Sequence, residues 1–313
     1  MIEIDNISKK FDNVDALTDV SAQIRESEVF GLIGTNGAGK STLLRIMSGI
    51  LRPDKGNIRI DQQAVYENIP AKTNLFYISD DQFFFPNDKP RDMMSFYKGC
   101  YPTYDEQRFE ELLNVFELPK ERKISTYSKG MKKQLFVALG LAAGTKYLFC
   151  DETFDGLDPL MRQKVKALFK NEMEKRKLTP VIASHSLREL EDICNHIGLL
   201  HKGGILFSRD MNDMQLGVHR INLILKPGKY LEEIKELDVI SDNPNGSIHM
   251  LTVRGDIEKI KSMLNASDPV FYEEVPLTLE EVFICETESF IKKLNNPAAG
   301  EEVNENDVKE LIS

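Results

Sequence analysis

A glycine-rich run near the start of the chain restricts its fold more than any other feature. Residues 34–41 read GTNGAGKS, which matches the pattern G-x-x-x-x-G-K-[ST]. An apolar run at 29–33 precedes this loop, and a helix-like run at 42–47 follows it. In a strand–loop–helix arrangement, the backbone N–H groups of the loop and the positive end of the helix converge on an anion. The sequence therefore predicts a nucleoside-triphosphate site in an α/β domain.

The loop also assigns roles to individual side chains. Lys40 is long enough to reach the β- and γ-phosphates, and the hydroxyl of Ser41 can ligate Mg²⁺. The residues expected to contact the nucleotide here are Asn36, Gly37, Ala38, Gly39, Lys40, Ser41 and Thr42.

Two later apolar runs are expected to bring further polar side chains to the same site. One run ends in Asp151 and Glu152, and the other is followed by His185. Such runs are typical of parallel strands buried on both faces, whose carboxyl ends share one edge of the sheet. We expect Asp151 to hold Mg²⁺, directly or through water, and Glu152 to be the general base for an attacking water. A ring nitrogen of His185 is expected to contact the γ-phosphate.

Patterning along the chain predicts two folded domains and a tail. Residues 1–216 alternate strand and helix patterns, with helical periodicity at about 86–140, and this order indicates a parallel sheet with helices. Residues 217–287 are expected to form a small α+β domain. The acidic segment 288–313 is expected to be a flexible tail.

Within the smaller domain, the pattern predicts a helix at 230–237 and a turn at 242–246, where the residues are Asp-Asn-Pro-Asn-Gly. The segment 248–253 is expected to be a strand and 257–264 a helix.

The composition of the chain limits which partners and which cellular compartment we expect for it. Fifty acidic residues against 40 basic ones give a net charge of −10, which disfavours non-specific binding to nucleic acid or to anionic lipid. The four cysteines are far apart, without a C-x-x-C pair, and are expected to be reduced thiols. Apolar stretches fall short of the roughly 20 residues of a membrane-spanning helix, and the first residues lack a secretory pattern. A cytoplasmic protein is therefore expected.

Three further motifs lie in a fixed order around the phosphate loop. Phe11 stands in the run KKFD, residues 127–131 read YSKGM, and residues 156–158 read GLD. Together with the loop at 34–41 and the run that ends at Glu152, these motifs resemble those of the ATP-binding subunits of ABC transporters. The resemblance extends over about residues 2–210.

The resemblance implies a P-loop NTPase (RecA-like) parallel-sheet core with an antiparallel β subdomain and a helical subdomain, followed by the small C-terminal domain. It implies that Phe11 stacks on the adenine of ATP and that His185 is the switch histidine. Ser128 and Gly130 lie in the signature motif, which in this family contacts the γ-phosphate held by the opposite subunit. A serine that caps a helix is suited to this role, because a capped helix N-terminus attracts anions. ATP is then held between two ATP-binding subunits, in a homodimer or a heterodimer.

The sequence departs from the family pattern at two positions. Asp80 stands where the family has its Q-loop glutamine, with Gln82 two residues later, and we expect the carboxylate of Asp80 to bind Mg²⁺ or the attacking water. Lys129 replaces the first glycine of the signature and adds a positive charge there.

The resemblance also implies an integral-membrane permease as partner, which would place the chain on the inner face of the cell membrane. The aromatic run at 83–85 lies where the family docks its permease, and residues 276–283 are similar to the tail of exporters of drugs, antimicrobial peptides or lipids. Export is therefore expected, without nucleic acid as a partner. The alternatives are a soluble ABC ATPase that acts on ribosomes, DNA or assembly without a permease, and a regulatory NTP switch with little turnover.

Overall fold

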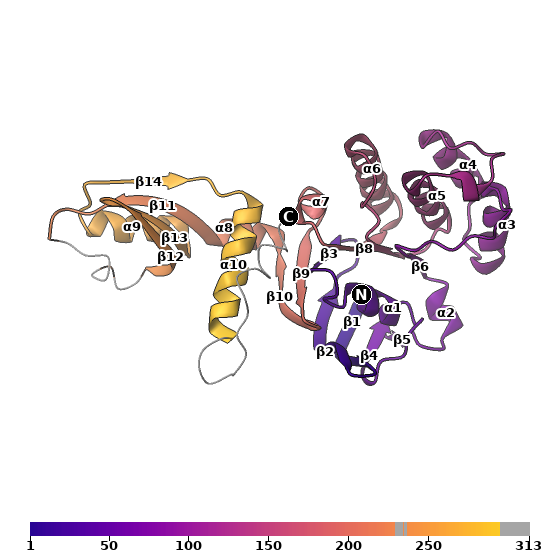
Figure 1. Ribbon diagram of the computed structural model, residues 1–313, viewed down its shortest axis with the longest axis horizontal. Helices are drawn as coiled ribbons and strands as arrows, with labels where there is room; N and C mark the ends of the chain where they lie inside the picture. Colours follow the sequence, from indigo (N-terminus) through magenta and orange to yellow (C-terminus); the bar gives the residue numbers. More distant parts are fainter. Residues whose placement is uncertain (229–233, 235–236, 295–313) are drawn as a thin grey trace. The chain divides into compact units, whose positions relative to one another are not determined.

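A six-stranded sheet forms the centre of the first of the two units into which the chain divides, residues 1–208 and 209–313 (Figure 1). The computed structural model describes residues 1–228, 234 and 237–294. The strands lie in the order β10 (Gly204–Asp210), β9 (His196–His201), β3 (Phe30–Ile33), β8 (Thr179–Ser184), β7 (Tyr147–Asp151) and β6 (Leu75–Ile78). The pairs from β9 to β6 are parallel, and every residue of β3, β7 and β8 is buried. Continuous apolar runs form such strands because both faces of the sheet are covered.

A second, antiparallel sheet packs against the same core. Its strands lie in the order β2 (Val14–Ile24), β1 (Ile2–Phe11), β4 (Lys55–Ile60) and β5 (Gln63–Ala64). Helix α1 (Lys40–Met47) shares one apolar cluster with both sheets, and the cluster includes Ile4, Leu17, Ile58, Leu43, Leu44, Phe149 and Val181. This packing fixes the start of α1 at the end of β3, where the phosphate loop was expected.

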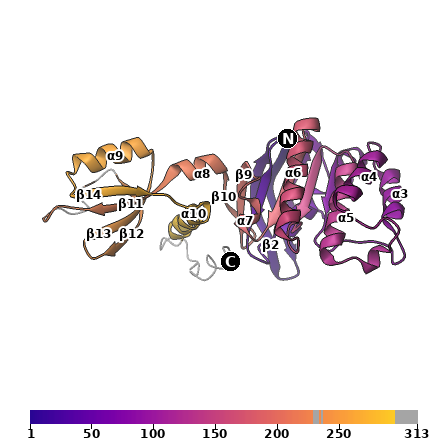
Figure 2. The same ribbon diagram turned by 90° about the horizontal axis from the view of Figure 1, so that it is seen from above.

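The helices of the first unit fall into two groups, those of the helical subdomain and the remaining ones. The helical subdomain consists of α3 (Pro90–Cys100), α4 (Glu106–Val115) and α5 (Lys129–Ala142), with a 3₁₀ turn at Ile124–Thr126. These helices lie together in Figures 1 and 2. The other helices are α2 (Ile69–Lys72), α6 (Pro159–Arg176) and α7 (Leu187–Leu190), with α6 and α1 on opposite sides of the central strands in Figure 1. Together with the two sheets, this arrangement confirms the predicted fold class.

The second unit is built on a four-stranded antiparallel sheet. Its order is β12 (Asp238–Asn245), β13 (Ile248–Arg254), β11 (Val218–Ile224) and β14 (Phe271–Val275). Helix α9 (Ile257–Ala266) lies on one face of this sheet (Figure 2) and contributes Ile260 and Leu264 to a core with Ile221 and Leu251. The unit also contains α8 (Met211–Gly217) and α10 (Leu279–Leu294).

The second unit differs from the sequence expectations at its borders and at one turn. It begins at Arg209, within β10, and therefore earlier than residue 217. The expected turn at 242–246 is wrong for most of its length, because residues 242–245 belong to β12. Pro244 is tolerated there since β12 is an edge strand.

Two further expectations concern residues 230–237 and 288–313 of the second unit. Helix α10 continues to Leu294, so residues 288–294 are helical and are not part of a tail. Of the expected helix at 230–237, residues 230–233, 235 and 236 lie outside the described residues, and so does the remainder of the tail. Among the residues that the structure describes, no helix has both the length and the apolarity needed to cross a membrane.

Candidate active site

The loop between β3 and α1 forms the floor of an open cleft of about 390 Å³. The cleft is lined by Asn36, Gly37, Ala38, Gly39, Lys40, Ser41 and Thr42 from the loop and α1, together with Val14, Asp15, Ala16, Thr35, Asp80, Glu152 and Lys202. All seven residues of this segment that were expected to contact nucleotide therefore share one surface.

Two glycines of the loop are required by close packing. Gly39 has a φ of 105°, and a Cβ atom there would lie 2.5 Å from the carbonyl oxygen of Ala16. A Cβ at Gly34 would lie 2.4 Å from the carbonyl oxygen of Leu200. Both positions exclude a side chain, because a left-handed φ and a backbone contact of this kind are compatible only with glycine. The loop is thereby held against the ends of neighbouring strands.

Lys40 is buried at the first position of α1, with its side chain 5% exposed. Its ammonium donates to the carbonyl oxygens of Gly34 at 2.7 Å and of Thr35 at 3.2 Å. The same nitrogen lies 3.2 Å from Oε1 of Glu152. A cation is thus fixed between the loop and the end of β7, where phosphate oxygens of a bound nucleotide would accept its hydrogen bonds.

The carboxylate of Asp151 lies beneath the loop, at the end of β7. Ser41 Oγ donates to its Oδ1 and the hydroxyl of Tyr77 donates to its Oδ2, each at 2.9 Å. Burial raises the pKa of Asp151 despite these hydrogen bonds, and the charges of Glu152 and Asp80 act in the same direction. Burial next to Asp151 also raises the pKa of Tyr77 to about 12.

The pair of Ser41 and Asp151 suits a hard cation. Mg²⁺ takes oxygen ligands, with one or two carboxylates and the remainder from phosphate and water. Among the described residues, His, Cys, Asp and Glu do not gather in threes at a position that could hold a metal. The oxygen donors of Ser41 and Asp151 fit Mg²⁺ that would bind together with the phosphates of a nucleotide.

Glu152 follows Asp151 and turns away from the strand direction. Its φ is 46°, and its N–H donates to the carbonyl oxygen of Ala183 in β8 at 3.0 Å. Its Oε2 lies 2.8 Å from Nδ1 of His185, which follows the end of β8. The Glu152 side chain is 14% exposed and that of His185 is 41% exposed. Glu152 therefore contacts both Lys40 and His185 at the edge of the sheet where the strands end.

The signature region is a helix N-terminus. Ser128 precedes α5, and its Oγ accepts a hydrogen bond from the N–H of Met131 at 3.2 Å. Gly130 packs so closely on the loop that follows β7 that a Cβ would lie 3.2 Å from the carbonyl oxygen of Gly156. Lys129 Nζ lies 2.7 Å from Oδ2 of Asp155, so its charge is paired within the same chain.

Three of the expected nucleotide contacts lie elsewhere. In the described part of the chain, neither Phe11 nor Ser128 nor Gly130 lines the cleft. Phe11 ends β1 and pairs with Val14, which does line it. The Phe11 ring is 43% exposed, with the ammonium of Lys9 located 5.5 Å from its centre.

Two residues of this site were not identified from the sequence. Tyr77 belongs to an apolar run in β6, and only the parallel pairing of β6 with β7 brings its hydroxyl to Asp151. Lys133, on α5, has a completely buried side chain whose Nζ lies 3.1 Å from Oδ1 of Asp80. In the sequence, these residues could have been noticed only as a polar group in an apolar run: the hydroxyl of Tyr77 in a buried strand and the ammonium of Lys133 in an apolar helix.

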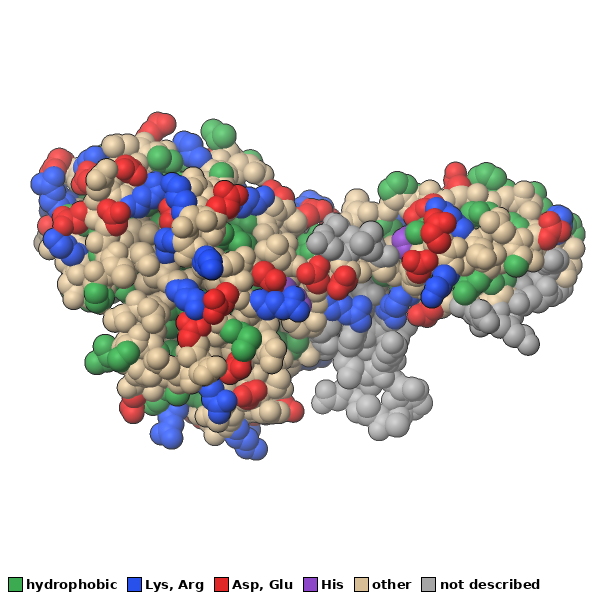
Figure 3. Space-filling model, turned by 180° about the vertical axis from the view of Figure 1, so that it is seen from behind, with side chains coloured by type: hydrophobic (Ala, Val, Ile, Leu, Met, Phe, Trp, Pro, Cys, Tyr) green, Lys and Arg blue, Asp and Glu red, His purple; other side chains and the backbone are tan. Residues whose placement is uncertain are grey.

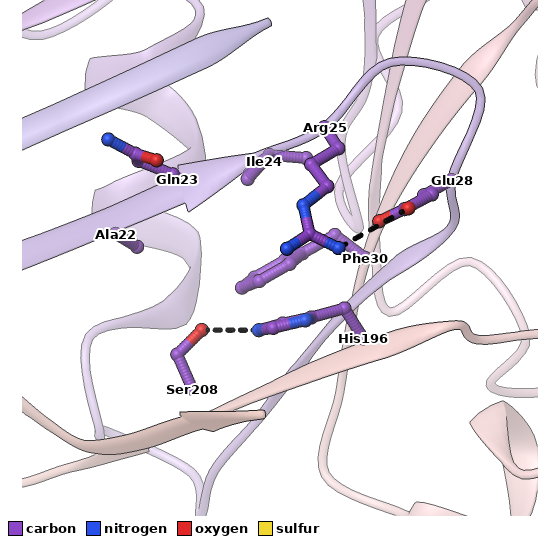
Figure 4. A pocket seen from close by; sticks show the side chains of 8 residues that line it. All are labelled: Ala22, Gln23, Ile24, Arg25, Glu28, Phe30, His196 and Ser208. Atoms are coloured by element: carbon purple, nitrogen blue, oxygen red, sulfur yellow. Dashed lines mark hydrogen bonds and ion pairs between the residues drawn. The ribbon is translucent and has the colours of Figure 1, made fainter. Parts of the chain in front are cut away.

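A second cavity, of about 240 Å³, lies at the opposite end of the central strands (Figure 4). The rings of Phe30 and His196 stack there with centres 5.6 Å apart, and His196 Nε2 lies 2.8 Å from Ser208 Oγ. Arg25 and Glu28 form an ion pair at 3.7 Å across its rim. Phe30 and His196 begin their strands, whereas the nucleotide loop follows the strand ends, so the two cavities are separate.

Comparisons with known proteins agree with this geometry. The family model described as "ABC transporter" matches residues 17–155. The chain is 31% identical over 285 residues to the ABC transporter ATP-binding protein YtrB of Bacillus subtilis (strain 168), a match that covers 91% of this chain and 97% of YtrB. It is 26% identical over 209 residues to the bacitracin transport ATP-binding protein BcrA of Bacillus licheniformis, covering 66% and 68% of the two chains.

A solved structure shows the same fold. The dimeric structure of an ATP-binding cassette bound to ADP and Pi aligns with a TM-score of 0.61 at 21% identity, over 67% of this chain and 98% of the other.

Proposed function

Since this chain belongs to the family of ABC transporter ATP-binding proteins, we propose that it hydrolyses ATP to drive a separate membrane permease that exports its cargo. The observation that carries this proposal is that the carboxylate of Glu152 lies within hydrogen-bonding distance of both Lys40 and His185 at one edge of the sheet. Beside them lies the pair of Ser41 and Asp151. This set provides a phosphate cradle, a cation site and a base.

In the proposed site, ATP lies along the loop at 34–41 with its phosphates at Lys40. Ser41 and Asp151 would hold Mg²⁺, and Asp80 at the rim of the same cleft is a further proposed ligand, directly or through water. When bound, Mg²⁺ neutralises charge on the phosphate oxygens. Phe11, next to the cleft-lining Val14, is proposed to stack on adenine.

Hydrolysis requires a base that can take a proton from water. Glu152 is suited to this because its carboxylate is held between Lys40 and His185 and is mostly buried. The hydrogen bond to Nδ1 leaves the other ring nitrogen of His185 available for the γ-phosphate in our proposal. Lys40 stabilises the negative charge of the transferred group.

We propose that a second ATP-binding subunit completes the site. The capped N-terminus of α5 is a suitable anion site, but in this chain Ser128 and Gly130 do not line the cleft. A partner subunit that places its own Ser128 against this cleft would hold ATP between two chains. Because the residues of one chain supply both halves, a homodimer would have two equivalent sites.

The permease is proposed to dock on the aromatic side chains near the helical subdomain. Phe83 is 70% exposed, Phe96 is 50% exposed and Phe85 is 44% exposed. The rings of Phe83 and Phe85 are 5.2 Å apart, and those of Phe85 and Phe96 are 6.1 Å apart, so they form one apolar surface. Exposed aromatic groups of this kind mark interaction sites. This surface would place the chain on the inner face of the cell membrane.

Export of a drug, an antimicrobial peptide or a lipid is the proposed direction, supported by the similarity of residues 276–283 to the tails of such exporters. Acting without a permease is the alternative function. Figure 3 shows acidic and basic side chains intermingled over the face of the first unit that it draws, which does not favour a nucleic-acid partner on that face. Purification of the tagged chain from membranes separates the two: an integral-membrane protein that co-purifies supports the permease, and its absence supports the alternative.

The catalytic part of the proposal is tested by Glu152→Gln, which keeps the shape of the side chain but removes its basicity. We expect ATP binding within about twofold of wild type and ATP turnover lowered by about 10²–10⁴-fold, the usual contribution of a general base. Nucleotide binding is measured by fluorescence titration and turnover by phosphate release.

Glu191→Gln is the matched control, because Glu191 is an exposed carboxylate at the end of α7. It should leave turnover unchanged. If Glu152→Gln hydrolysed ATP at nearly the wild-type rate, the assignment of the base would be wrong.

A further inference from the structure

One buried cation lies behind the proposed base. The side chain of Lys133 is completely buried, on α5 shortly after Ser128. A buried ammonium is costly unless it is paired and hydrogen-bonded. Its Nζ donates to the backbone carbonyl oxygen of Glu152 and lies 3.1 Å from Oδ1 of Asp80. Asp155 Oδ2 is 3.9 Å away. Lys133 therefore joins three segments that are far apart in the sequence.

The contact with Glu152 is made to a strained part of the backbone. The φ of Glu152, 46°, is in the left-handed region that residues with a side chain seldom adopt. Such a conformation persists only where its surroundings hold it. The N–H of Glu152 donates to Ala183 and its carbonyl oxygen accepts from Lys133, so both ends of this residue are fixed. This conformation directs the carboxylate to Lys40 and His185.

The contact with Asp80 connects the same lysine to the loop that follows β6. Asp80 is half exposed at the rim of the cleft, and its carboxylate faces the ammonium of Lys133. Movement of this loop, or of α5, would therefore reach the backbone of Glu152 through one side chain.

We propose that Lys133 is a positioning residue that holds Glu152 in its working backbone conformation and couples that conformation to Asp80. The inference rests on the proposed function of Glu152 as the base. As a consequence, the orientation of the Glu152 carboxylate depends on the position of the loop after β6 and on the position of α5.

The test compares Lys133→Met, which keeps the length of the side chain without a donor, with Lys133→Arg, which keeps charge and donors. For Lys133→Met we expect kcat for ATP to fall about 10²-fold, as for a catalytic group displaced by about 1 Å, with KM within about twofold. Lys133→Arg should recover a substantial part of kcat. Lys132→Met is the control on the neighbouring position and should keep the wild-type kcat.

Coupling is measured by double variants. If Lys133 acts through Glu152, Lys133→Met should have little further effect on kcat in the Glu152→Gln background. If Lys133 had only a structural role, Lys133→Met would lower kcat by the same factor in this background as in the wild type. Lys133→Met and Asp80→Asn should likewise combine to less than the product of their separate effects on kcat. Should Lys133→Met fail to fold, Lys133→Arg and Asp80→Asn, which alters a half-exposed side chain, carry the test.

The outcomes separate the two proposals. Near-wild-type turnover of Glu152→Gln would overturn the function of the base itself. Loss of turnover in Glu152→Gln with an unchanged kcat in Lys133→Met, or in Asp80→Asn if the methionine variant does not fold, would overturn only the positioning role. Fully multiplicative effects in the double variants would also overturn it.

Discussion

Some residues of the nucleotide site adopt states that are unfavourable for the stability of the fold. Asp151 is 1% exposed, and burial raises its pKa because the charged carboxylate is poorly solvated there. Glu152 adopts a left-handed backbone conformation that is uncommon for a glutamate. Positions that cost stability in this way are typical of sites where function requires a fixed geometry. In this protein the two unfavourable states occur where phosphate and cation would bind.

Phe11 allows a prediction at the same scale. Its ring is 43% exposed beside the cleft, so its replacement by alanine should disturb the fold little. Phe11→Ala is expected to weaken ATP binding by about 1–3 kcal/mol, by analogy with the stacking of a base on an aromatic ring. The dissociation constant is measured by titration with ATP, and GTP should lose affinity too, since any base has a face to stack.

Phe96→Ala is the matched control for Phe11, because it removes a ring that is 50% exposed in the helical subdomain. It should leave both affinities unchanged. Equal affinities of Phe11→Ala and wild type for both nucleotides would argue against the stacking contact.

At the scale of helices and strands, ion pairs attach the helical subdomain to the core. Glu172 of α6 is 7% exposed and accepts hydrogen bonds from Arg108 of α4 at 2.7 and 3.1 Å. Arg176 donates to its other oxygen at 2.7 Å. Removing the carboxylate would leave two partly buried guanidinium groups without this partner.

Glu172→Gln is therefore expected to lower the free energy of unfolding by about 2 kcal/mol, below the loss for a fully buried pair because both arginines are partly exposed. Thermal unfolding followed by circular dichroism provides the measurement. Glu121→Gln, which breaks the exposed pair with Lys89, should leave Tm unchanged. Equal values of Tm for the two variants would contradict the proposed attachment.

A second cluster joins the start of β7 to the end of β4. Asp61 accepts hydrogen bonds from Lys146 Nζ at 2.8 Å and Tyr147 Oη at 2.7 Å, and its Oδ1 lies 2.8 Å from the amino group of Met1. Burial acts to raise the pKa of Asp61, but the hydrogen bonds from Lys146, the amino group and Tyr147 lower it well below its usual range.

A lowered pKa in the folded state means that Asp61 stabilises the fold above its unfolded pKa of about 3.9, and that this contribution is lost as the pH falls below that value toward the folded pKa. Asp61→Asn should thus lower the free energy of unfolding by about 1 kcal/mol at pH 7, a value reduced for partial exposure. Urea unfolding at a series of pH values should show the two proteins converging below about pH 4. A difference that stays constant with pH would show that the charge of Asp61 is not responsible.

The sequence predicted those parts of the site that depend on local order. The position of Lys40 can be predicted from a strand before its loop and a helix after it. The positions of Asp151, Glu152 and His185 follow from the rule that parallel strands end at one edge of the sheet. The sequence did not identify Tyr77, because its role depends on the register between two strands that are far apart in the chain.

Lys133 was missed for a related reason. A helical pattern shows which face of α5 is apolar, but the partners of a lysine on that face depend on how α5 packs. The expected turn at 242–246 failed because turn-forming residues also occur on an edge strand, where neighbouring strands outweigh local preference.

At the scale of the whole molecule, we propose that one chain carries the two complementary halves of a nucleotide site on different surfaces. The loop at Lys40 lines a cleft, and the capped start of α5 at Ser128 does not line it. Two chains arranged head to tail would bring each half against the other and enclose ATP twice. Hydrolysis would then separate the halves, which couples the chemistry at Glu152 to a movement that a permease can use.

The mass of the Glu152→Gln variant in solution, measured by light scattering with and without ATP, tests this account most directly. We predict a monomer without nucleotide and a dimer with ATP. The dimer should be lost when Ser128→Arg, which blocks the helix tip, or Lys40→Ala is added. A variant that binds ATP and stays monomeric, or one that still dimerises with Ser128→Arg added, would contradict the two-chain site.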